Sequence, residues 1–163
     1  LRMTLKLDPD FHEANNFLGY LFVENNKNLD EAIQLISKAL KVQPKNGAYL
    51  DSLGWAYYKK AQREGRDDYL ITALKILSEA VQLMEEPDIY DHIGEVYYSL
   101  GHWDQAVKAW EKSHAFFSRM PNHDKKRENI EAKLEKIKKV ISAEEKSSGV
   151  IENRVKVEKS IQP

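Results

Sequence analysis

The sequence predicts an all-α protein built from stacked pairs of antiparallel helices. A glycine preceded by a large apolar residue recurs at Gly19, Gly54 and Gly94, which lie 35 and 40 residues apart. Internal periods of this length are typical of repeated supersecondary units. The 163 residues include no cysteine, so disulfide frameworks and thiolate metal sites are excluded. They also contain no apolar run long enough to span a membrane.

Each recurring glycine lies in the middle of an expected helix, where it costs about 1 kcal/mol relative to alanine. Close packing against a partner helix offsets this cost, because a glycine lets two backbones approach. The glycines therefore mark the first helix of each unit. Each has a large apolar residue before it and an aromatic residue three positions after it: Leu18 and Phe22, Leu53 and Tyr57, Ile93 and Tyr97.

The second helix of each unit is marked by small residues seven positions apart with a bulky residue between them. The small residues are expected to serve the same close approach as the glycines. Pro9, Pro44 and Pro87 stop or start helices at the junctions between units. The three sets are Ala32, Ile36 and Ala39; Ala73, Leu77 and Ala80; and Ala106, Trp110 and Ser113.

These motifs resemble the tetratricopeptide repeat, in its bacterial type, over about residues 5–120. "LGY", "LGW" and "IGE" carry the first half of the repeat motif, and "DEAIQLISKALKVQP" carries the second half. The resemblance implies a right-handed superhelical solenoid with a concave face. The expected division is the end of a preceding repeat at 1–11, then unit one at 12–46, unit two at 47–86 and unit three at 87–121.

Two units depart from the regular repeat. Unit one has one extra residue in its turn, within "VENNKNLDEA", and unit two is longer because of "AQREGRDDYLITA". Gly65, Asp67 and Asp68 are typical of a surface loop followed by a helix start. The alternative is that the first helix of unit two simply runs longer. Both interpretations remain open from the sequence.

Residues 122–146 are expected to form a capping helix over unit three. Ile130, Leu134, Ile137 and Ile141 recur at spacings of four, three and four, which gives one apolar stripe. A coiled-coil helix and a membrane-surface helix are the alternatives. "SSG" at 147–149 is expected to end this helix, and 147–163 is expected to be a flexible tail. That tail could also add to another surface as an extended segment.

The resemblance implies that the concave face is lined by set positions of the three first helices. These positions are rich in aromatic and acidic side chains, which favour a protein or peptide partner carrying basic and apolar residues. Lys, Asn and Arg, which grip a peptide carboxylate in some members of this family, are absent from the corresponding positions. The candidate partner-binding residues are Asn16, Tyr20, Asp51, Trp55, Tyr58, Asp88, Asp91, Glu95 and Tyr98.

The distribution of charge and the motifs in the sequence restrict the classes of function that this chain can have. The net charge of −1 provides no general attraction to nucleic acid, although residues 1–120 are acidic (14 Lys and Arg, 18 Asp and Glu) and residues 121–163 are basic (11 and 8). The five histidines form no metal-binding spacing, and neither a glycine-rich phosphate loop nor a nucleophile elbow is present. The sequence therefore predicts no catalytic site, no metal and no cofactor.

The expected function is a non-enzymatic scaffold that binds a protein or peptide on its concave face. One alternative is a self-association module, in which the capping helix or the tail forms homo-oligomers. Another is an accessory region of a larger enzyme. Many bacterial proteins of this family are exported or attached to the envelope, so the envelope or periplasm and the cytoplasm both remain open. No membrane insertion is expected from these residues.

Overall fold

The computed structural model describes residue 8 and residues 10–160, except for the side chains of 145 and 147–160. This part of the chain is helical and contains no strand, which confirms the all-α class. The expectation for 1–11 lies almost entirely outside the described residues. The helices are α2 (His12–Glu24), α3 (Leu29–Val42), α4 (Gly47–Glu64), α5 (Asp67–Leu83), α6 (Pro87–Ser99), α7 (Trp103–Phe117) and α8 (Asp124–Ser160).

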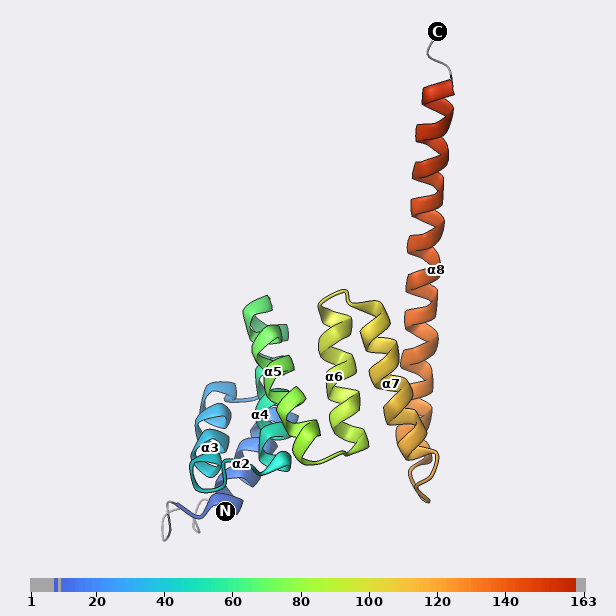
Figure 1. Cartoon of the computed structure of the whole chain (residues 1–163). Helices are drawn as coiled ribbons and strands as arrows, with labels where there is room; N and C mark the ends of the chain where they lie inside the picture. Colours follow the sequence, from blue (N-terminus) through green and yellow to red (C-terminus); the bar gives the residue numbers. More distant parts are fainter. Residues whose placement is uncertain (1–7, 9, 161–163) are drawn as a thin grey trace.

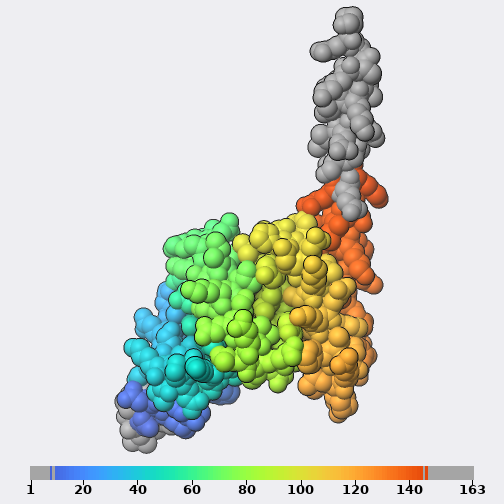
Figure 2. Space-filling model, in the orientation of Figure 1, coloured from blue at the N-terminus to red at the C-terminus, as the bar shows by residue number. Residues whose placement is uncertain are grey.

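The helices form hairpins that stack in chain order. α2 packs against α3, α4 against α5 and α6 against α7, and each hairpin contacts the next (Figure 1). Figure 2 shows the hairpins following one another across one face of the molecule, from blue to orange. This architecture confirms the predicted tetratricopeptide-like array. None of the described helices combines the length and the apolar character needed to cross a membrane.

The recurring glycines face the bulky residues of the partner helix. A Cβ atom on Gly19 would lie 2.6 Å from Ile36 Cγ1, and one on Gly54 would lie 2.6 Å from Leu77 Cγ. A Cβ atom on Gly94 would meet the indole of Trp110. Cβ atoms essentially never approach other heavy atoms this closely, so only glycine fits. The predicted close approach of the two helices is confirmed.

The small residues of the second helices are completely buried. Ala32, Ala73 and Ala106 each have 0% exposure, as do the bulky residues Ile36 and Leu77 between the small positions. Side chains of this size let the second helix lie close to the first, and the bulky residue fills the remaining space. Most of the apolar interior is therefore formed within and between the hairpins.

The length of unit two comes from a longer first helix. α4 runs for 18 residues to Glu64, and Gly65 ends it in the left-handed conformation with φ of 63°. The Gly65 N–H donates to the carbonyl of Ala61 at 2.8 Å, which closes the last turn. α5 then begins at Asp67. The structure therefore has the longer helix, and it also has the turn at Gly65 and the helix start at Asp67 that the other interpretation expected.

The apolar stripe of α8 packs against α7. Ile130 and Ile137 are 1% and 0% exposed and lie in one cluster with Trp110 and Phe117. Leu134 and Ile141 are partly buried at the edge of the same cluster. The stripe therefore covers the last hairpin.

The prediction that α8 ends at "SSG" is wrong, because the helix continues to Ser160 and passes beyond α7 (Figure 1). One glycine in a helix costs only about 1 kcal/mol relative to alanine, and serine costs less. The flanking Glu and Lys residues favour a helix, and no proline or alternative cap stops it. The backbone of 147–160 is consequently helical and not a flexible tail.

Candidate protein-binding surface

We use the name concave face for the nine candidate residues on the first helices, α2, α4 and α6. The structure links many of them by contacts that cross from one hairpin to the next.

Trp55 is the centre of an aromatic stack. Its ring lies 4.6 Å from the ring of Tyr58 and 4.0 Å from that of His92, with interplanar angles of 9° and 14°. The ammonium of Lys59 lies 4.6 Å from the Trp55 ring centroid, and the indole N–H donates to Glu24 at 3.1 Å. The stack therefore joins α2, α4 and α6 and holds Trp55 in a fixed orientation.

Asp51 is paired with His92 on the next first helix. His92 Nδ1 lies 2.8 Å from the Asp51 carboxylate, and each side chain is 16% exposed. Burial lowers the pKa of His92, but Asp51 and the neighbouring Asp91 and Asp88 raise it more, so the net pKa is above its ordinary value. The pair favours a protonated imidazole on the concave face.

Tyr58 is more buried than a freely available binding residue. It is 9% exposed, and its hydroxyl donates to Glu95 at 3.1 Å. Burial and the Glu95 charge raise the pKa of its phenol, which keeps the hydroxyl protonated as a donor. Tyr58 therefore stacks against Trp55 and holds the Glu95 carboxylate by a hydrogen bond, while little of its own side chain is exposed.

Asp91 and Glu95 share an ammonium group that comes from α8. Lys133 Nζ lies 2.6 Å from Asp91 and 2.7 Å from Glu95, and the indole N–H of Trp110 donates to Asp91 at 2.9 Å. Burial lowers the pKa of Lys133, but the two carboxylates raise it more. Lys133 is therefore the cationic partner of Asp91, as His92 is the cationic partner of Asp51.

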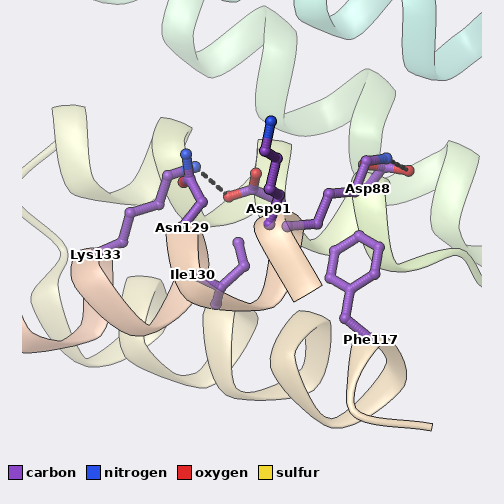
Figure 3. Close-up of a pocket in the computed structure, with 8 residues that line it drawn as sticks. Asp88, Asp91, Phe117, Asn129, Ile130 and Lys133 are labelled. Atoms are coloured by element: carbon purple, nitrogen blue, oxygen red, sulfur yellow. Dashed lines mark hydrogen bonds and ion pairs between the residues drawn. The ribbon is translucent and has the colours of Figure 1, made fainter. Parts of the chain in front are cut away.

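Asp88 is also paired with α8. Lys126 Nζ lies 2.6 and 2.7 Å from the two Asp88 oxygens, and both side chains are about half exposed. The two ion pairs border a cavity of about 330 Å³ between α6 and α8, in which Lys133 points to Asp91 (Figure 3). Sequence reasoning missed these lysines, although they lie seven residues apart beside the Ile130 stripe.

Tyr98 is a concave-face residue of α6 that contacts both α7 and α8. Its ring packs against Trp103 and Trp110 with centroids 5.3 and 5.7 Å apart, and Lys136 of α8 lies 5.0 Å from its centroid. Tyr98 is thus largely committed to contacts inside the protein.

The α2 end of the concave face is the open end. Tyr20 is 36% exposed, and burial together with Glu24, Asp51 and Asp88 raises the pKa of its phenol. The buried amide oxygen of Asn16 has no hydrogen-bond partner within the described part of the chain. Exposed aromatic surface surrounded by carboxylates is thus concentrated near Tyr20.

No chemistry beyond binding is indicated by the side chains that the structure describes. Among them, no three His, Cys, Asp or Glu residues are grouped to hold a metal ion. The arrangement offers aromatic surface, carboxylates and ammonium groups, which are the elements of polar and apolar contact with another protein.

Comparison by sequence identifies residues 12–46 as a match to the tetratricopeptide repeat family profile. A TPR repeat-containing protein of Pseudomonas aeruginosa is 36% identical over 95 residues, which are 58% of this chain and 15% of that protein. The chain therefore spans about 15% of the length of this relative.

Solved structures share the fold. PcrH of P. aeruginosa, in complex with the chaperone binding region of PopD, matches with a TM-score of 0.68 and 20% identity over 80% of this chain and 93% of PcrH. The first TPR of Spaghetti (RPAP3), bound to the HSP90 peptide SRMEEVD, matches with a TM-score of 0.57 and 18% identity over 76% and 92%. At these identities the likeness concerns the fold alone.

Proposed function

We propose that this chain, a tetratricopeptide-repeat protein, is a non-enzymatic scaffold that binds a segment of a partner protein on its concave face. The observation that carries the proposal is the aromatic surface of Tyr20 and Trp55 with Glu24 and Asp51 around it. Tyrosine and tryptophan provide large contact area at low entropic cost, which suits them to anchoring a partner.

The partner segment carries basic and apolar residues. Cations are attracted to the exposed ring of Tyr20 and to the carboxylates near it. PcrH and the first TPR of RPAP3 bind segments of other proteins, which supports the same type of use here. The peptide SRMEEVD is acidic, however, and the first helices of this chain lack lysine and arginine at the positions that would grip a carboxylate. A different partner chemistry is therefore proposed.

The proposal is tested by capturing partners with the purified chain and mapping the binding of each one. Tyr20→Ala removes an exposed side chain of the concave face, and Ile71→Ala removes an even more exposed apolar side chain of α5. We expect Tyr20→Ala to weaken binding at least about tenfold and Ile71→Ala to leave it unchanged. The reverse result would place the binding surface on the second helices and would contradict the proposal.

A second candidate function is self-association through α8. The observation that favours it is the continuation of α8 to Ser160, well past the contact between Trp103 and Glu144. Light scattering should then give a mass above 18.9 kDa that rises with concentration, and a chain ending at 146 should stay monomeric. A constant monomeric mass for the whole chain would exclude this candidate.

A further inference from the structure

α8 supplies cations to the acidic end of the concave face. The three carboxylates that α6 contributes to this face, those of Asp88, Asp91 and Glu95, are all paired with Lys126 or Lys133. The four N–O distances lie between 2.6 and 2.7 Å. α8 therefore already provides the basic side chains that this part of the surface attracts (Figure 3).

The backbone of α8 is held by contacts that do not involve these lysines. Ile130 and Ile137 alternate with Lys126 and Lys133 along the helix, and the two isoleucines are buried against α7. Lys126 is 49% exposed, so its ammonium can leave Asp88 by changing rotamers while the helix stays in place. Lys133 is 23% exposed and is more firmly held.

Building on the proposed function, we infer that α8 is an intramolecular occupant of the acidic end of the concave face. Lys126 and Lys133 hold the places that basic residues of a partner would take on α6. A partner with Lys or Arg binds there in competition with these two ammonium groups, whereas the surface around Tyr20 is open to it. α8 thus weakens the binding of basic segments to α6, so that these segments bind preferentially to α2 and α4.

Competition has a direct consequence for affinity. Removing the Lys133 ammonium frees Asp91 and Glu95 for an external cation, so a basic probe should bind more tightly. The probe is a fluorescent octapeptide of alternating Lys and Leu with blocked ends, followed by polarisation at low salt. We expect Lys133→Met to bind it about three- to tenfold more tightly than the unchanged chain, and Lys126→Met to show a smaller gain in the same direction.

Two further variants make the test specific. Lys138→Met removes an exposed lysine of α8 that lines a different hollow, and it should leave the affinity unchanged. The triple variant Lys133→Met, Asp91→Asn, Glu95→Gln removes the ammonium and both carboxylates while preserving side-chain size. It should lose the gain, and its cooperative melting checks that the fold is intact.

The outcomes separate this inference from the proposed function. If Lys133→Met binds the probe no more tightly than the unchanged chain, α8 is not a competitor. If Tyr20→Ala nevertheless weakens probe binding both in the unchanged chain and in Lys133→Met, the scaffold proposal stands. A gain that persists in the triple variant would also overturn the inference, because no carboxylate would be left to explain it. If an octapeptide of alternating Glu and Leu binds the unchanged chain more tightly than the basic probe, the proposed partner chemistry itself is wrong.

Discussion

The interior of the hairpins and the concave face are built from different kinds of contact. Inside each hairpin, a glycine of one helix meets a bulky residue of the next, as Gly54 meets Leu77, and the surrounding side chains are apolar. On the concave face, carboxylates of one first helix pair with cations of another helix, as Asp51 pairs with His92 of α6 and Asp91 pairs with Lys133 of α8. The first kind of contact determines the fold, and the second determines which charges of the proposed binding surface remain unpaired.

Removal of α8 should have the largest effect on stability, because α8 contributes to both kinds of contact. A chain ending at 121 loses Ile130 and Ile137, whose burial is worth about 2 kcal/mol each, and it exposes Phe117. We expect the unfolding free energy to fall by at least about 4 kcal/mol, with aggregation on melting. A chain ending at 146 keeps the stripe and should melt almost as the whole chain does. Equal losses in the two truncations would mean that the end of α8 is structural.

Gly54→Leu breaks the hairpin contact at a buried position that is not among the concave-face residues. A Cβ atom there would lie 2.6 Å from Leu77 and 3.4 Å from the Ala73 carbonyl oxygen, so the two helices would have to separate. Overpacking of this kind costs about 1–3 kcal/mol. Ala48→Leu, at an exposed position of the same helix, is the control and should change the melting temperature little. If both variants melt alike, close approach does not explain the glycine.

Asp91→Ala and Asp88→Ala compare a half-buried and an exposed pair on the same helix. Asp91 is 22% exposed and accepts from both Trp110 and Lys133, so its loss leaves the Trp110 indole N–H without its partner and Lys133 with Glu95 alone. We expect a loss of about 1–3 kcal/mol in unfolding free energy. Asp88→Ala breaks an exposed ion pair worth at most about 1 kcal/mol. Urea denaturation measures both, and a larger loss for Asp88→Ala would reverse the ranking of the two pairs.

The Asp51–His92 pair predicts a smaller effect that depends on pH. Although burial lowers the pKa of His92, the nearby carboxylates raise it more, so folding strengthens proton binding. The stabilisation is therefore fully present below the ordinary histidine pKa of about 6.5 and is lost as the pH rises through the raised value. The unfolding free energy of the unchanged chain relative to His92→Gln should fall as the pH rises above about 6.5. A constant difference would show that folding does not change the pKa of His92 and would contradict the prediction.

The hairpin interior could be predicted from the sequence because its signals are local. The spacing of Gly54, Ala73, Leu77 and Ala80 follows the period of a helix, and a helix determines which side chains share a face. The end of α8 could not be predicted in the same way. "SSG" is a weak stop that its helix-favouring neighbours outweigh.

The concave-face pairs could not be predicted, although the resemblance indicated which positions line that face. Asp51 and His92 are 41 residues apart, and Asp91 and Lys133 are 42 apart. Their contact depends on how each hairpin is rotated against the next and on which rotamers are chosen. Nothing in the local pattern near Asp91 indicates that α8 will supply its cation. The sequence of α6 therefore suggested more unpaired negative charge than the structure leaves for a partner.

The three tryptophan indoles provide the most direct measurement of the central claim, that a partner binds the concave face at its α2–α4 end. The indole N–H of Trp55 donates to Glu24 in that region, that of Trp110 donates to Asp91, and that of Trp103 donates to Glu144 of α8. Each gives its own signal in a ¹H–¹⁵N spectrum, so titration with a captured partner locates the contact. We predict the largest shift for Trp55 and the smallest for Trp103. A partner that shifts Trp103 and leaves Trp55 unchanged would contradict the account.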